Sequence, residues 1–319
     1  ILVIALAEAS PVLIDRFVEA GDLPTIKRII SQGAHGRLES VIPTLTPQMW
    51  GAINTGRSAG HHGLFDFWQR DDKGEFVETR GDSLTQPAIW DIVNDSGRKS
   101  AIMNVPFTYP PSRVDGFMIS GEDAPGAGKD IANPPDLYDE ITRQFGRYRL
   151  KDIFPAGRQK SDYLTLVEDD VRAQTDVFCH LLAENEWDFS MVFYSATAIT
   201  QHYFWADMES GDETNPYHDV IPSAYRALDT AIARLWEAAG EDCCVYVISE
   251  CGAGPLRSGV HMNTVLERAG LLKRRSDSNG LTSRRRSVSR LRKSAQHLMQ
   301  SYLPSWAYRQ ANARLGWLK

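Results

Sequence analysis

Residues 41–67 read VIPTLTPQMWGAINTGRSAGHHGLFDF, and the interpretation of the whole chain starts from this stretch. The pair Thr46-Pro47 precedes an apolar run from Met49 to Ile53, which predicts a short helix entered at a proline, a residue tolerated in the first turn. Such a helix would direct the Thr46 hydroxyl and the free N–H groups of its first turn toward one point. A phosphate is favoured there, because these N–H groups and the helix dipole attract negative charge.

A second interpretation of the same stretch is structural. Thr55-Gly56 and Gly60-His61-His62-Gly63 mark a tight loop after the helix, in which the two histidines would brace the turn. Short motifs of this kind have a high false-positive rate, so a capped helix followed by a glycine-rich turn remains an alternative. Asn54, near the end of the predicted helix, is a second candidate for binding phosphate.

The composition is that of an ordinary globular protein. The 319 residues are 42% hydrophobic and 24% charged, and no stretch approaches the roughly 18 consecutive apolar residues of a membrane span. The first residues, ILVIALA, lack Met and a basic leader, so we expect a strand and a natural N-terminus further upstream. The cysteines show no C-x-x-C spacing, which favours a reducing, cytoplasmic location. They are Cys179, Cys243, Cys244 and Cys251.

Charge divides the chain into an acidic body and a basic tail. Residues 271–319 contain 12 Lys or Arg and one acid, whereas residues 1–270 contain 23 and 40. The tail also has apolar residues at helical spacing, at Leu291, Ala295, Leu298, Met299 and Tyr302. We therefore expect a core in residues 1–272 and a basic helical segment in residues 273–319. This segment either contacts an anionic surface or is an insertion in a longer, truncated domain.

Predicted strands and helices alternate along the chain. The strands are expected at 1–7, 99–105, 116–120, 189–194 and 243–248, and the helices at 11–20, 23–33, 89–96, 161–185 and 222–239. This order predicts an α/β fold with a mostly parallel sheet sandwiched between helix layers. Ligands bind beyond the carboxyl ends of such strands. Three of these ends carry polar residues, at Ala7-Glu8, Ser195–His202 and Ser249–Cys251.

Six blocks in the right order resemble the type I phosphodiesterase/nucleotide pyrophosphatase family of the alkaline phosphatase superfamily. The resemblance covers most of residues 1–272 and implies an alkaline-phosphatase-like fold. The blocks are VIALAEAS, the stretch RLES continued by residues 41–67, PAIWDIV, MNVPFTYPP, WDFSMVFYSATAITQHYFW, and VYVISECGAGP with the following NTVLERAGLL.

The resemblance also implies a chemistry. Members of this family use two bound metals, usually zinc, and a Thr or Ser nucleophile that attacks phosphorus. Thr46 falls on the nucleophile position. The metals would lower the pKa of a bound oxygen and neutralise phosphate charge in the transition state.

The metal ligands implied by the resemblance are only partly present. Ala7 and Ala198 replace two aspartates, whereas His202 is retained and Glu250-Cys251 stand at an Asp-His pair. The remaining candidate ligands are Thr46, His202, Glu250 and Cys251, which predict at most one zinc ion or none. Glu8 could replace the lost carboxylate at position 7 only if the strand bends there, because successive side chains point to opposite faces.

Two functions remain open from the sequence. The first is a hydrolase of phosphodiesters or nucleotide pyrophosphates, with Thr46 as nucleophile and an incomplete metal site. The second is a catalytically inactive pseudoenzyme that binds a phosphorylated small molecule or a protein partner. His202 could instead pack among its aromatic neighbours, and Cys251 could simply fill a turn. The number of replaced ligands favours the second function, whereas the resemblance to the family favours the first.

Overall fold

The computed structural model describes residues 1–150, 159–240 and 242–273. The chain divides into two compact units. The first consists of Ile1–Phe154 and Gln159–Gly254, and the described part of the second begins at Pro255 and contains one helix, α10 (Met262–Arg268). The predicted boundary at residue 272 stays a prediction, and the basic segment predicted for 273–319 lies, from residue 274 on, outside the described residues.

One six-stranded sheet forms the centre of the first unit, in the order β6-β5-β4-β7-β1-β8. All neighbours are parallel except β5 and β6. The strands are β1 (Leu2–Leu6), β4 (Ser100–Met103), β5 (Gly116–Ile119), β6 (Ala132–Asn133), β7 (Phe189–Tyr194) and β8 (Val245–Ile248). The predicted α/β fold with a mostly parallel sheet is therefore confirmed.

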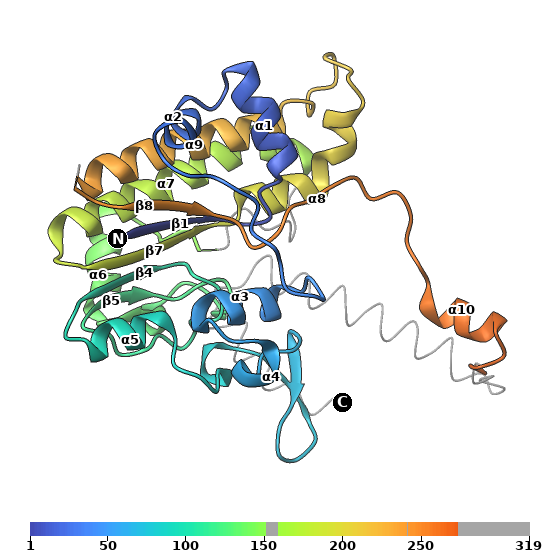
Figure 1. Ribbon diagram of the computed structural model, residues 1–319, viewed down its shortest axis with the longest axis horizontal. Helices are drawn as coiled ribbons and strands as arrows, with labels where there is room; N and C mark the ends of the chain where they lie inside the picture. Colours follow the sequence, from blue (N-terminus) through green and yellow to red (C-terminus); the bar gives the residue numbers. More distant parts are fainter. Residues whose placement is uncertain (151–158, 241, 274–319) are drawn as a thin grey trace. The chain divides into compact units, whose positions relative to one another are not determined.

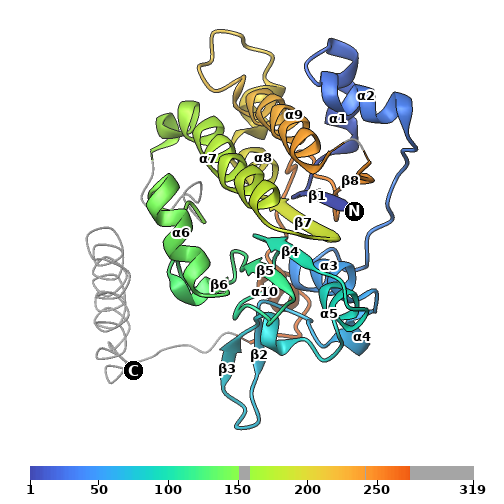
Figure 2. The same cartoon turned by 90° about the vertical axis from the view of Figure 1, so that its left-hand side faces the viewer.

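Helices cover both faces of this sheet (Figures 1 and 2). On one face lie α1 (Pro11–Ala20), α2 (Pro24–Gln32), α6 (Asp136–Phe145), α7 (Tyr163–Glu184), α8 (Ala196–Glu209) and α9 (Val220–Ala239). On the other face lie α3 (Thr46–Thr55), α4 (Ala59–His62) and α5 (Ile89–Asp95). A hydrophobic core lies on each face of the sheet, and successive side chains of a strand point into one core and then the other. In β1, Leu2, Ile4 and Leu6 belong to the first core and Ala5 belongs to the second.

The strand predicted for Cys243–Ile248 differs from expectation. It is shorter, Val245–Ile248, and its side chains are only partly buried, with Tyr246 52% exposed. Within the described residues, β8 pairs with β1 on one side only, which makes it an edge strand. A run of apolar residues does not reveal whether a strand lies inside a sheet or at its border.

A small hairpin follows α4 where the sequence shows only a polar stretch. Its strands are β2 (Trp68–Arg70) and β3 (Phe76–Glu78), which pair antiparallel. The turn is held by Asp71, whose Oδ1 accepts hydrogen bonds from the amides of Lys73 and Glu75, both at 2.9 Å. The part of the chain that the structure describes also contains three short 3₁₀ helices, at Gly81–Ser83, Lys129–Ile131 and Lys160–Asp162.

None of the helices within the described residues is both long and apolar enough to cross a membrane. The four cysteines form no disulfide with one another. The compartment in which the protein works stays a prediction.

Candidate functional site

Thr46 is the first residue of α3 and is partly exposed. The first turn of α3 offers fewer free amides than the sequence predicts. The N–H groups of Gln48 and Met49 both donate to the carbonyl of Leu45, at 2.9 and 3.0 Å. Pro47 has no N–H. Among these first residues, only the Thr46 amide has no hydrogen bond to a described residue, so the prediction of a cluster of free N–H groups is wrong.

The far end of α3 is buried in the core. Asn54 is fully buried, and its amide nitrogen donates to the carbonyl of Pro106 at 3.0 Å. Its Oδ1 has no hydrogen bond. The structure thus gives Asn54 a position inside the fold, and its role in phosphate binding stays a prediction.

The histidines after α3 brace this region, as the structural interpretation of the sequence predicts. His62 is fully buried, and its Nδ1 accepts a hydrogen bond from the Leu64 amide at 3.1 Å. Burial lowers the pKa of His62, which favours the neutral ring. The ring lies against Gly51 of α3, where a Cβ atom would come within 2.3 Å of His62 Cε1. His61 Nδ1 lies 3.0 Å from Ser58 Oγ.

The carboxyl end of β1 bends at Glu8, which has a φ of 53°. This left-handed conformation is unfavourable for a residue with a side chain. Hydrogen bonds hold the bend from two sides: the Glu8 amide donates to Glu250 Oε1 at 3.3 Å, and the Glu8 carbonyl accepts from Gln201 Nε2 at 2.9 Å. The bend that the sequence requires for Glu8 to enter the site is therefore present.

At this bend, Glu8 meets His202 of α8. Glu8 Oε2 lies 2.8 Å from His202 Nε2, and the His202 side chain is 60% exposed. The hydrogen bond that His202 donates to the Glu8 carboxylate raises the pKa of His202. Its neighbour Phe204, not His202, enters the aromatic cluster, with ring centroids 5.4 Å from Tyr163 and 5.9 Å from Tyr217.

Glu250 is a buried carboxyl group, only 4% exposed. Burial raises its pKa to about 7, while the hydrogen bond from the Glu8 amide and the indole of Trp50 oppose the shift. Glu250 Oε2 and Trp50 Nε1 nevertheless have no well-formed hydrogen bond. The indole therefore stabilises the carboxylate only weakly.

Cys251 follows in the turn after β8. Burial, together with the nearby carboxyl groups of Glu250 and Glu8, raises the pKa of its thiol to about 12. The backbone of this turn is fixed by Ser249, whose Oγ donates to the Cys251 carbonyl at 2.7 Å and accepts from the Ala9 amide at 2.9 Å. The thiol is thus protonated at neutral pH.

These side chains do not fit the two-metal site implied by the resemblance. Ala7 and Ala198, at two of the implied ligand positions, have no side-chain atom that can bind a metal. His202 Nε2, the atom that would bind a metal, contacts Glu8 instead. Within the described residues, no three His, Cys, Asp or Glu side chains are placed to share a metal ion.

Comparison with known proteins shows the family of the chain and its fold. Residues 1–309 match the family model described as type I phosphodiesterase / nucleotide pyrophosphatase. No curated protein matches the sequence.

Among solved structures, phosphonoacetate hydrolase from Sinorhizobium meliloti 1021 with phosphonoformate matches 84% of this chain, with 18% identity and a TM-score of 0.59. The same enzyme with phosphonoacetate matches with 16% identity and a TM-score of 0.57. Murine ectonucleotide pyrophosphatase/phosphodiesterase 5 matches with 14% identity and a TM-score of 0.42. This chain spans only 61% of the first enzyme's length, and at this identity the match demonstrates a shared fold alone.

Proposed function

Because the chain belongs to the type I phosphodiesterase/nucleotide pyrophosphatase family, we propose that it binds a phosphate ester at the start of α3 without two-metal hydrolysis. In this proposal Thr46 contacts the phosphate through its hydroxyl and its free amide. The observation that carries the proposal is the contact of 2.8 Å between Glu8 and His202. In this contact, the one histidine retained at a metal-ligand position is hydrogen-bonded to another side chain of the protein.

The surroundings of this contact support the same conclusion. Ala7 and Ala198 supply no donor atom at two of the ligand positions. Glu250 has a pKa of about 7 and so is largely protonated in mildly acidic solution. A metal ion would have to break the Glu8–His202 pair and also deprotonate a buried group, and both steps oppose binding.

Thr46 and Glu250 border the same region. Trp50 follows Thr46 by four residues on α3, so the two side chains lie on one face of the helix. The Trp50 indole interacts with Glu250. This connection supports a binding region between the start of α3 and the turn after β8, as the position of ligands in parallel sheets suggests.

A second candidate function is hydrolysis with a single metal ion, and the bend at Glu8 favours it. The bend brings a carboxylate oxygen and an imidazole nitrogen within 2.8 Å of each other, and zinc accepts both kinds of donor. If the pair opened to admit a metal ion, that ion would supply charge neutralisation at the phosphate. Thr46 would then act as the nucleophile.

Elemental analysis combined with ester binding separates the two functions. Zinc and manganese per chain are measured after incubation with metal and exhaustive dialysis, in the natural chain and in His202→Ala. Binding and turnover of bis(p-nitrophenyl) phosphate and AMP are measured in the natural chain, Thr46→Ala and the control Thr44→Ala, an exposed position two residues earlier.

We expect no stoichiometric metal, no turnover, and binding that is weakened in Thr46→Ala but not in Thr44→Ala. One metal per chain that disappears in His202→Ala, with turnover that disappears in Thr46→Ala, would instead establish the single-metal hydrolase. Failure to bind either ester, or equal binding by the two threonine variants, would overturn the proposal.

A further inference from the structure

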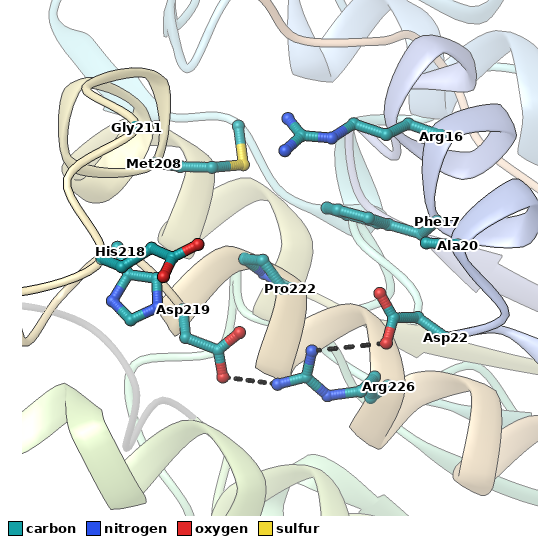
Figure 3. A pocket seen from close by; sticks show the side chains of 11 residues that line it. Arg16, Phe17, Ala20, Asp22, Met208, Gly211, His218, Asp219, Pro222 and Arg226 are labelled. Carbon is teal, nitrogen blue, oxygen red and sulfur yellow. Dashed lines mark hydrogen bonds and ion pairs between the residues drawn. The ribbon is translucent and has the colours of Figure 1, made fainter.

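A pocket of about 280 Å³ lies in the helix layer of the first unit (Figure 3). Its walls come from α1, the last turn of α8, the loop of residues 210–219 and the first turns of α9. None of its lining residues belongs to the region around Thr46, Glu8 and Glu250. A ligand in this pocket would therefore occupy a site separate from the candidate phosphate site.

Hydrogen bonds within the loop of residues 210–219 fix one wall of the pocket. The Asn215 side chain donates to Asp207 at 3.0 Å and accepts from the amide of Tyr217, also at 3.0 Å. The carbonyl of Asn215 lies 2.7 Å from His218 Nδ1. Because the loop is tied both to α8 and to itself, its side chains form a defined surface.

An ion-pair network closes the bottom of the pocket in the view of Figure 3. The Arg226 guanidinium contacts Asp219 at 2.5 Å and Asp22 at 3.7 Å. These two carboxylates more than balance the one positive charge, so Arg226 has little attraction left for an anionic ligand.

Two other charged groups in the lining remain unpaired. Arg16 and Glu213 form no hydrogen bond or ion pair with a described residue, and both are exposed. The Arg16 guanidinium lies 5.8 Å from the centre of the Phe17 ring and points toward Met208 across the pocket (Figure 3). The lining thus offers one cation and one anion that a ligand can pair with.

The pocket lining also contains apolar side chains. Phe17 and Pro222 form part of its inner surface, and the thioether of Met208 faces them (Figure 3). Thioether and aromatic groups bind apolar and aromatic bodies well. The volume is close to the lower end of ligand pockets, roughly 300 Å³, which suits a small molecule rather than a segment of a macromolecule.

We propose that this pocket binds a small zwitterion with an apolar body, of the size of a hydrophobic amino acid. The carboxylate of the ligand pairs with Arg16, its ammonium group pairs with Glu213, and its apolar body packs against Phe17 and Met208. Either charge alone recognises only half of such a ligand, and the apolar side chains of the lining favour a ligand with an apolar body over a small inorganic ion.

Three probes that share a phenyl group on a short carbon chain and differ in their charged groups test this assignment by titration calorimetry of the full chain. They are L-phenylalanine, which carries both charges, 3-phenylpropionate, which carries only the carboxylate, and phenethylamine, which carries only the ammonium group. We expect L-phenylalanine to bind at least about tenfold more tightly than either single-charge probe, because each charged contact contributes separately.

Substitutions at the two charged residues assign each contact. Arg16→Gln should weaken L-phenylalanine about tenfold and leave phenethylamine unchanged, whereas Glu213→Gln should weaken both of these and leave 3-phenylpropionate unchanged. The matched controls Arg143→Gln and Glu184→Gln, at exposed positions on α6 and α7, should alter no affinity.

The proposal is overturned if L-phenylalanine shows no saturable binding up to roughly 10 mM, or if the affinity is the same in all four variants. It is equally overturned if both pocket substitutions weaken all three probes alike, because the charges would then have no separate roles. Urea denaturation of each variant shows whether a loss of binding reflects a loss of folded protein.

Discussion

His202 Nε2 lies 2.8 Å from Oε2 of Glu8, a residue 194 positions earlier in the chain. Glu8 has a left-handed backbone, with a φ of 53°. This conformation is unfavourable for a residue that carries a Cβ atom, so the backbone at this contact is strained. The strain can be measured.

Replacing Glu8 by Gly should give a more stable protein than replacing it by Ala. Both variants lose the carboxylate, but only alanine retains a Cβ atom in a left-handed conformation. We expect the free energy of unfolding of Glu8→Gly to exceed that of Glu8→Ala by about 1 kcal/mol in urea denaturation. Equal stabilities would contradict the left-handed bend.

The Glu8→Gln variant should lower the pKa of His202 toward its ordinary value of 6.5, because the hydrogen bond that His202 donates to the Glu8 carboxylate is what raises it. An NMR titration of the imidazole protons in both proteins measures this directly. Since the folded-state pKa is the higher one, the pair stabilises the fold fully below pH 6.5. That contribution is lost as the pH rises through the folded-state pKa. An unchanged titration curve in Glu8→Gln would show that the pair does not form in solution.

Glu250 should make the protein less stable as the pH rises from about 4.5 to about 7, the ordinary and the folded-state pKa of this group. Over this range the unfolded chain releases the proton while the buried carboxyl retains it, so the free energy of unfolding falls. Glu250→Gln cannot ionise, and its unfolding free energy should lack this fall. Urea denaturation of both proteins at several pH values tests the difference, and parallel curves would argue against a buried, protonated Glu250.

Gly51→Ala should destabilise the protein by about 3 kcal/mol, because the added methyl group would come within 2.3 Å of the buried His62 ring. Gly60→Ala is the matched control, since a Cβ atom there meets nothing within 4 Å. Urea denaturation of the two variants should therefore give clearly different midpoints. If Gly51→Ala were as stable as the control, His62 would not pack against α3 as described.

Asp123→Asn should also destabilise the fold, by about 2 kcal/mol. The Asp123 carboxylate accepts hydrogen bonds from the amides of Phe107, at 3.0 Å, and Tyr109, at 2.8 Å. Asparagine offers only one acceptor oxygen, so one amide would lose its partner. Asp95→Asn, at the exposed end of α5, is the control and should leave the urea midpoint unchanged.

The regular elements of the fold could be predicted because their signals are local. Pro11 and Gly21 bound α1, and the apolar run Phe189–Tyr194 forms β7 with the predicted limits. The carboxyl ends of β1, β7 and β8 could also be placed on one edge, since parallel strands all end on the same side. This much follows from residue types and spacing.

The candidate site could be predicted only in part, because its decisive features depend on distant segments. The bend at Glu8 is held by hydrogen bonds to Glu250 and Gln201, and no local sequence pattern at position 8 predicts it. The exposure of β8 depends on which strands pair with it. The loss of free amides in α3 depends on the carbonyl of Leu45, which accepts two of them.

The position of β1 in the sheet has a consequence for synthesis on the ribosome. Leu2 pairs with Ser190 and with Val245, so β1 lacks both neighbours until the segments that contain these residues have been made. At about 5–20 residues per second, this delay lasts roughly 10 to 40 s. Throughout that time an apolar strand with two free edges is exposed to other proteins. A chaperone that holds the nascent β1 segment should therefore raise the yield of folded protein more than one that acts on the finished chain.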